Sequence, residues 1–514
     1  MISTLRQWFQ QPGQLEPIED QMPIPDIEGV ADEKELANKA SSTLLAFEKS
    51  TGLDGVLDYA TYLAGTSATL LLLIIILVVW VVVGAVFHAP SNWQIAMQDS
   101  QSIQCYLWDS ILMRQQINYH ESFLHVVTRL RSRNITVQRL LANIMADEKL
   151  TKGIPAKSIT SSDSKSTGSA VDLALETWMD KLSNKVAKVL GSFVFIILFW
   201  FGIAAWIACG VIWLPSGNEP PFSGERSGQN PMYSQFGSLW QMYINTAVAV
   251  ELLVSSVFLQ NIRRRHNDFV TKYLQEISIL DYSLESQLRV MTKDVNPNAI
   301  VKTEYPPRTW AEKCIDYYSR IIGTMFGVWI AIIVFAVWIG VGTLMQWSSN
   351  WWLIIGTYTG LAGFLDGFIL RNVYSRMSRH EFEQLSIFSR EDRQNFEIIG
   401  VSVPEEQLPS ISRLERLSNW FAELCSSSAA VGVALAILIG LLCASSALKW
   451  SLFGQLLSNT PTMIIEGFFL LILIQGANWK DMHLRVELYN ICLRRRTLVE
   501  YIDTLSAEGR CCVY

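Results

Sequence analysis

Side chains able to bind metal ions are concentrated in residues 92–116, directly after a run of hydrocarbon side chains. The segment reads NWQIAMQDSQSIQCYLWDSILMRQQ and contains six glutamines and two aspartates. At about 100° per residue, most of its polar side chains share one face of a helix. That face carries Gln94, Gln98, Gln101, Ser102, Cys105, Asp109 and Gln116. The sequence therefore predicts one polar stripe at membrane depth.

Carboxylates at this depth decide what the stripe could bind. An ionised Asp at the centre of a membrane helix costs roughly 2.5–3.5 kcal/mol on insertion scales. No Lys or Arg lies deep in any predicted span to offset that cost. The acids concerned are Asp99, Asp109, Glu251, Asp366 and Glu466. We therefore expect these carboxylates to hold a cation or a proton.

The donor types indicate which cation to expect. Oxygen donors with at most one thiol suit a divalent ion such as Fe²⁺ or Mn²⁺ better than zinc or Cu(I). Neutral amides hold such an ion weakly, which favours flux over affinity. For any single Gln or Ser, hydrogen bonding between helices is the competing interpretation. The predicted metal ligands are Gln98, Ser102, Cys105, Asp109, Asn245 and Glu466.

Four further residues rank below these ligands. Asp99, Glu251 and Asp366 lie roughly 80–120° off the shared face of a regular helix, so we rank them second, as metal or proton sites. His88 lies at the outer end of the first apolar run. We assign it to the outer mouth of the path, where it would meet an ion first.

The elements that must position these residues are membrane helices. A content of 50% hydrophobic and 17% charged residues is typical of a membrane protein. Each apolar run is long enough to cross about 30 Å of hydrocarbon, and a more polar segment follows it. We predict an all-α membrane protein with eight transmembrane helices in four hairpins. The apolar runs are Leu70–Phe87, Leu190–Leu214, Ile321–Met345 and Cys425–Leu448, and the second segments end near residues 114, 262, 372 and 478.

The hairpins resemble copies of one unit. Trp93, Trp240 and Trp351 align at the start of the second spans, and a weaker fourth copy aligns through Asn478. Because every hairpin begins and ends on the same side, we expect parallel repeats around a central axis. The apolar first helices should face lipid and the polar second helices should face inward. The face that corresponds to the polar stripe is small in the third copy, with Gly356, Gly360, Gly363 and Gly367.

Basic residues predict the orientation. Loops between the two spans of a hairpin hold only Arg226 and Lys449 among the 41 Lys and Arg residues. The positive-inside rule then places both termini and the long connectors in the cytosol. The connectors carry apolar residues at helical spacing, such as Val137, Leu140 and Leu141, so the helices should extend into the cytosol.

The same features divide the chain into six parts. Each of four parts holds one hairpin, and the other two are a cytosolic N-terminal segment and a flexible Ser/Thr-rich linker. The parts are the N-terminal segment 1–50, hairpin 51–150 with a cytosolic helix, linker 151–170, hairpin 171–305 with a cytosolic helix, hairpin 306–410, and hairpin 411–514 with the C-terminal tail.

Several functional classes lack sequence support. The eight cysteines are scattered, without a disulfide framework or a zinc-type CxxC pair. The chain has no Gly-Lys dipeptide and hence no P-loop. A net charge of −6, with basic residues near the spans, suits a membrane surface and not nucleic acid. We expect a non-enzymatic protein whose partners are lipid and a divalent ion, with no cofactor beyond that ion.

Two segments resemble a known family. NWQIAMQDSQSIQCYLWDSILMRQQ resembles the second-span signature of the fungal low-affinity iron permeases. LWQMYINTAVAVELLVSSVFLQNIRRR is similar to short bacterial relatives in Trp240, Asn245-Thr246 and Gln260-Asn261. The resemblance covers most of the membrane portion. It implies a plasma-membrane importer of Fe²⁺ that tolerates other divalent metals, such as Mn²⁺, Zn²⁺ and Cu²⁺.

The leading functional hypothesis is uniport or channel-like passage of divalent cations. A divalent ion that enters down about 100 mV gains on the order of 4–5 kcal/mol from the field, which suffices for uniport. One alternative is a proton-coupled transporter in which Glu251 or Asp366 titrates. A second is a membrane scaffold whose stripe only packs helices. The pore forms either within one chain or between two paired chains, so homo-oligomerisation stays open.

Overall fold

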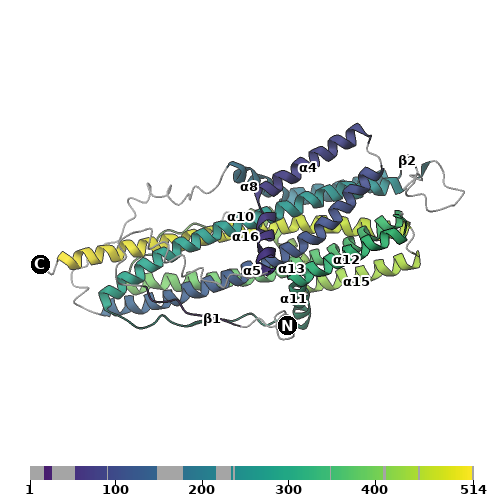
Figure 1. Ribbon diagram of the computed structural model, residues 1–514. Coiled ribbons are helices and arrows are strands. Elements are labelled where there is room, and N and C mark those ends of the chain that lie inside the picture. The colour runs from purple at the N-terminus through teal and green to yellow at the C-terminus, as the bar shows by residue number, and fades with distance from the viewer. Residues whose placement is uncertain are drawn as a thin grey trace, which may run out of the picture.

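The computed structural model describes residues 17–25, 53–88, 91–146, 178–212, 214–215, 233–234, 238–347, 349–408, 412–449 and 452–511. Within these ranges, four helices of more than 50 residues run nearly the whole length of the molecule (Figure 1). These central helices pack side by side in the cyclic order α5, α10, α16, α13. Their bounds are α5 Ser91–Ala146, α10 Ser238–Thr292, α13 Ser349–Ile399 and α16 Leu452–Cys511.

Apolar helices surround one half of this bundle. Only 17% of the most apolar stretch of α4, of α12 and of α15 is buried, against 72% for that of α10 and 89% for that of α16. This arrangement agrees with the expectation that first helices face outward and second helices face inward. We call them the outer helices: α4 Ser67–Val86, α9 Phe193–Cys209, α12 Met325–Leu344 and α15 Ser428–Ala447.

Not every predicted span is apolar enough to be recognised by composition. In the described part of the chain, five helices could cross a membrane by length and hydropathy, and a sixth is added if the bent pair α8 and α9 is one span. The predicted spans that do not qualify are the second spans of the first and third hairpins, which form the first halves of α5 and α13. The prediction of eight spans is therefore supported for up to six segments and stays a prediction for these two.

A short amphipathic helix precedes each outer helix, and sequence analysis did not separate it from the apolar run. A sharp break separates each short helix from its outer helix, and the bend between α8 and α9 is 56°. The hydroxyls of Thr66, Ser192 and Ser427 cap the outer helices that begin at three of these breaks. The short amphipathic helices are α3 Leu53–Ala64, α8 Trp178–Leu190, α11 Trp310–Ile322 and α14 Arg413–Cys425.

Stacked tryptophans join the outer and central helices. The rings of Trp80 and Trp93 are 3.7 Å apart and nearly parallel, and each indole N–H donates to the backbone carbonyl of the other residue. The same contact joins Trp206 to Trp240 at 3.9 Å and Trp338 to Trp351 at 4.2 Å. In the fourth hairpin, hydrogen-bonded Ser445 and Ser458 replace the pair. These contacts fit the predicted alignment of tryptophans, while the internal repeat stays a prediction.

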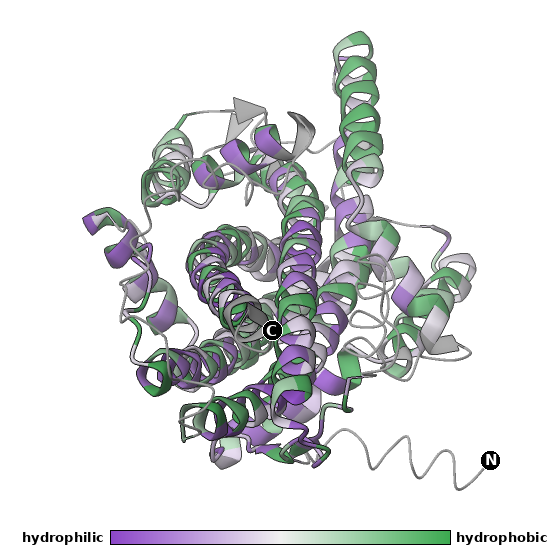
Figure 2. Cartoon of the chain, turned by 90° about the vertical axis from the view of Figure 1, so that its left-hand side faces the viewer, coloured by the Kyte–Doolittle hydropathy of each residue, from purple (hydrophilic) through white to green (hydrophobic). Residues whose placement is uncertain are grey.

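Beyond the breaks, the central helices continue as a bundle extension, residues 117–146, 264–292, 375–399 and 479–511. The predicted apolar stripe of residues 137–144 is buried in its core. Figure 2, which looks along the bundle, shows hydrophobic and hydrophilic residues alternating on the long helices. Buried ion pairs join these helices, such as Arg133 with Glu285 at 2.7 Å and Arg495 with Asp281 at 2.8 Å. The predicted helical extensions are therefore present, and they pack on one another.

Short strands complete the fold. Strand β1 (Ile18–Asp20) pairs antiparallel with β4 (Val301–Thr303) along the bundle extension, where Asp20 also pairs with Arg129. Strands β2 (Leu214–Pro215) and β3 (Tyr233–Ser234) pair antiparallel in the loop between α9 and α10. The predicted linker 151–170, most of the N-terminal segment 1–50 and most of loop 215–239 lie outside the described residues. The proposed division of the chain stays a prediction.

Candidate metal path between the central helices

The central helices bring one carboxylate each into a common electrostatic group. Asp109 on α5 lies within electrostatic range of Glu466 on α16 and of Asp366 on α13. Glu466 lies within range of Glu251 on α10 as well. The side chain of Cys105 lies beside Glu466 and donates to Gln104 at 3.6 Å. Asp109, Cys105 and Glu466, predicted from one helical face, are therefore neighbours.

Glycines make room for two of these carboxylates. A β-carbon on Gly363 would lie 2.8–2.9 Å from the carboxylate atoms of Glu466, closer than real contacts allow. A β-carbon on Gly467 would overlap Oε2 of Glu251. Glu466 of α16 therefore reaches the backbone of α13, and Glu251 of α10 reaches the backbone of α16. Each fits because the residue that it meets is a glycine. Glu251 fills a gap between helices, which explains how a residue off the polar face joins the group.

Polar side chains nearer the hairpin tips lie against other glycines of α13. Asn459 Oδ1 would lie 2.6 Å from a β-carbon on Gly360, and Asp99 Oδ1 would lie 3.8 Å from one on Gly356. Asn459 was missed because the fourth copy was aligned only from Thr462 onward. Its amide, three residues before Thr462, was the available signal. Asp99 therefore lies against α13, away from the carboxylates around Glu466.

Several of these side chains keep buried oxygens with no hydrogen-bond partner in the protein. A buried acceptor without a partner pays its full desolvation cost, so native proteins rarely retain one without a reason. Here they recur along the same bundle axis. The atoms are Asp99 Oδ2, Gln101 Oε1, Asp109 Oδ2, Asn245 Oδ1, Glu251 Oε2 and Asn459 Oδ1. They form an acceptor-rich interior that a cation, a water or a proton would satisfy.

The predicted ligand Gln98, and Gln104 outside the predicted stripe, are hydrogen-bonded between helices. Gln98 donates to Thr246 Oγ1 at 3.0 Å, and Gln104 donates to Ser256 Oγ at 3.0 Å. Both contacts join α5 to α10, as the competing structural interpretation expects for an amide. Ser102 is buried on the same face, and Asn245 is buried with neither amide atom paired. To bind an ion, Gln98 would have to give up its hydrogen bond to Thr246, whereas Asn245 has no hydrogen bond to lose.

Asp366 has a partner that sequence analysis missed. The Tyr318 hydroxyl donates to Asp366 Oδ1 at 2.7 Å. Tyr318 belongs to α11, outside every predicted span, so no pattern within the spans could reveal it. Glu251 likewise accepts from Ser255 at 2.8 Å. Although both were ranked second, their position beside Glu466 places them in the same group as the leading candidates.

His88 lies apart from this group. It is exposed at the tip between α4 and α5 and adopts a left-handed backbone conformation, with φ of 57°. Among the described residues, no three His, Cys, Asp or Glu side chains come close enough together to hold one ion. Any ion in this conformation would therefore complete its coordination with amide, hydroxyl or backbone oxygens or with water.

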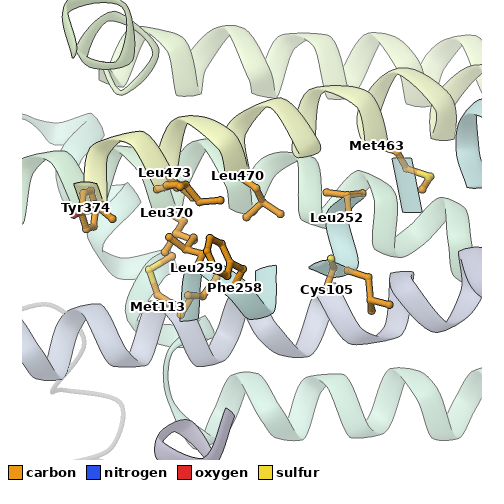
Figure 3. Packing of buried hydrophobic residues seen from close by; sticks show 14 of the residues in the cluster. Cys105, Met113, Leu252, Phe258, Leu259, Leu370, Tyr374, Met463, Leu470 and Leu473 are labelled. Carbon is orange, nitrogen blue, oxygen red and sulfur yellow. The ribbon is translucent and has the colours of Figure 1, made fainter. Parts of the chain in front are cut away.

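Apolar side chains close the interior below the carboxylates. Figure 3 shows Met113, Leu259 and Leu370 packed between Cys105 at one end and Tyr374 at the other. These residues belong to one buried cluster. The acceptor-rich interior therefore ends at an apolar seal before the bundle extension begins.

Comparisons with known proteins agree on one family. The family model described as low affinity iron permease matches residues 311–413 and 414–505. A low-affinity Fe(2+) transport protein of Saccharomyces cerevisiae is 45% identical over 464 residues, which cover 88% of this chain and 84% of that protein. A low-affinity iron/zinc ion transport protein of Schizosaccharomyces pombe is 38% identical over 475 residues, which cover 92% and 77%. No solved structure matches the chain.

Proposed function

The chain belongs to the low-affinity iron permease family, and from this premise we propose a route for the metal. The protein imports divalent transition-metal cations with low affinity, Fe²⁺ foremost, as the names of its relatives imply. The ion passes along the axis enclosed by the central helices. Fe²⁺ is the transported substrate and not a resident cofactor.

The row of buried, unpartnered acceptor oxygens carries this proposal. In lipid, an ionised carboxylate needs a partner, and no Lys or Arg pairs with Asp109, Glu251 or Glu466 in the described part of the chain. In a protein that only packs helices, these carboxylate oxygens would accept hydrogen bonds from donors on neighbouring helices. A divalent cation passing through supplies the missing positive charge.

The named residues divide the path into zones. His88 meets the ion at the outer mouth, and Gln98, Ser102 and Asn245 offer weak neutral donors near the hairpin tips. Cys105, Asp109 and Glu466 form the charged zone. Asp99, Glu251 and Asp366 stand beside this route as second-rank metal or proton sites. Weak neutral donors followed by a charged zone suit low affinity and rapid release.

We further propose that all eight helical segments cross the plasma membrane, with hairpin tips outside and both termini cytosolic. The exposed apolar surface of the outer helices fits lipid, whereas the bundle extension is too rich in charge to lie in it. Figure 1 places α8 and α11 midway along the long helices. Exposed Tyr59, Trp310 and Trp420 on the short amphipathic helices suit the membrane–water interface there.

Uptake of radiolabelled Fe²⁺ into proteoliposomes tests this proposal. With a potassium diffusion potential as the only driving force, Asp109→Asn and Glu466→Gln should each lower uptake by at least about tenfold, because a neutral amide weakens charge stabilisation in the path. Glu304→Gln, an exposed change in the connector before α11, is the matched control. Unchanged uptake in both path variants would refute the assignment.

A pH gradient separates uniport from proton coupling. Uniport predicts that the electrical potential drives uptake and that a pH gradient alone does not. Uptake driven by the pH gradient alone, and lost in Glu251→Gln or Asp366→Asn, would favour the proton-coupled alternative.

A further inference from the structure

A small polar cavity lies just inside the apolar seal, where the central helices enter the bundle extension. All of the central helices contribute to its wall. Because the seal separates it from the carboxylate group, it is distinct from the metal site proposed above. The lining side chains that matter here are Gln116 and Tyr119 of α5, Arg263 and His266 of α10, Tyr374 of α13 and Lys480 of α16.

Arg263 is a buried cation without an acidic partner. Its side chain is 5% exposed, and its Nε and Nη2 atoms are buried without a hydrogen-bond acceptor. The guanidinium lies 4.8 Å from the Tyr374 ring centroid and donates from Nη1 to the Leu112 carbonyl at 3.4 Å. In the described part of the chain no carboxylate pairs with it. A buried charge without a counter-ion is costly, so this position calls for an anion.

The nearby carboxylates are engaged elsewhere. Glu381 pairs with Lys480 and with His120, which lies 2.9 Å away. Although burial alone would raise it, these two partners lower the pKa of Glu381 to about 2, so Glu381 is ionised and committed to them. Asp481 is likewise shared between His266 at 2.8 Å and Arg485 at 2.7 Å. Neither acid is left to neutralise Arg263.

A second arginine adds to the excess of positive charge. Arg371 is 3% exposed, its Nε atom has no acceptor, and its guanidinium lies 5.9 Å from the Tyr374 ring centroid. Gln116 contributes a further unpartnered donor, Nε2, to the cavity wall. Unpartnered donors of Gln116 on α5 and Arg263 on α10 therefore face one small space, and Arg371 of α13 adds positive charge outside its lining.

We propose that this cavity binds a small inorganic anion of the halide class, held by Arg263 and Gln116 beside Lys480. Buried guanidinium and amide N–H groups are suitable donors for such an anion. A water molecule could accept from the same donors, but it would leave the charge of Arg263 unbalanced. The small size of the cavity favours chloride over a larger oxyanion.

This site has a consequence for transport, which rests on the proposed function, whereas anion binding itself does not. A divalent cation that leaves the seal meets the unbalanced positive charge of Arg263. A bound anion offsets this repulsion, so cytosolic chloride should accelerate delivery of the metal.

Bromide binding to the wild-type protein tests the site directly. A crystal of the protein grown or soaked in bromide should show an anomalous scattering peak inside the cavity, within hydrogen-bond distance of Arg263. An empty or water-filled cavity at saturating bromide would overturn the proposal. This measurement needs no transport, so it stays decisive if the proposed function fails.

Thermal unfolding with matched variants supplies the second test. In nanodiscs at constant ionic strength, replacing gluconate with chloride should raise the unfolding midpoint saturably, because a ligand of the folded state stabilises it. Arg263→Gln and Gln116→Leu should each raise the half-saturating chloride concentration, the arginine variant by at least about tenfold. Arg264→Gln removes the adjacent charge, which stacks on Tyr62 outside the cavity, and should respond as the wild type. Equal midpoints in chloride and gluconate would refute the site.

Discussion

At the residue scale, the proposed path depends on two acids, Glu466 and Glu251, that each lie against a glycine of a neighbouring helix. Helical periodicity alone makes Asp109 and Glu466 candidates, because both lie on a face that the sequence defines by itself. It could not place Glu251, Asp366 or Asn459. Their roles depend on which helix lies opposite, which is decided by packing between segments far apart in the sequence.

The glycine opposite Glu466 offers a test of this arrangement. Gly363→Ala would force the Glu466 carboxylate to move and should lower Fe²⁺ uptake several-fold. Alanine is a better helix former than glycine by about 1 kcal/mol, which offsets part of the cost of this overlap, so uptake should fall by more than expression does. Gly432→Ala on α15 is the control, since a β-carbon there would contact nothing within 4 Å. Wild-type uptake by Gly363→Ala would show that the position of Glu466 is unimportant.

At the scale of elements, each hairpin is held together near its tip by two side chains. The sequence aligned Trp93, Trp240 and Trp351 but gave no reason to pair them with Trp80, Trp206 and Trp338. Those partners lie in uniformly apolar helices, where no periodicity marks one face. The same uniformity hid the breaks before the outer helices, because amphipathic and apolar stretches merge in a hydropathy profile.

The contribution of the tryptophan pair in the third hairpin can be measured by replacing Trp351 with serine, the residue type found in the fourth hairpin. Trp351 is 2% exposed, and truncating a buried Trp costs roughly 3–5 kcal/mol. Trp351→Ser should therefore lower the thermal unfolding midpoint of the purified protein by several degrees. Trp329→Ser, at a half-exposed position on α12, is the matched control and should change it little. Equal midpoints for the two variants would mean that the stacked pair is not a structural clamp.

At the scale of the whole molecule, the described residues form two regions with opposite solvent preferences. The outer helices expose apolar surface, while the bundle extension buries ion pairs and presents charge. Sequence periodicity correctly predicted that the helices continue beyond the apolar region. The prediction that the extension lies on the cytosolic side rests on the distribution of basic residues.

Cysteine labelling of intact cells tests that orientation. In a variant whose native cysteines are replaced by alanine, His88→Cys should react with an impermeant maleimide added outside. Glu304→Cys, in the connector beside β4, should react only after permeabilisation. Both positions are exposed, so differences in labelling report the side of the membrane. The opposite pattern would invert the proposed topology.

Asparagines near the middle of the central helices, at the inner ends of the predicted spans, bear on the order of events during synthesis. Asn261 donates to the Gly65 carbonyl at 2.9 Å, Asn372 to Ser426 at 2.7 Å and Asn478 to Ala187 at 2.7 Å. Each bond joins one hairpin to the break of another. The bond between Asn478 and Ala187 therefore forms only after the fourth hairpin has been synthesised. Ribosomes deliver chains from the N-terminus onward, so a nascent chain that stops before residue 478 lacks the hydrogen bond that joins its second hairpin to the fourth.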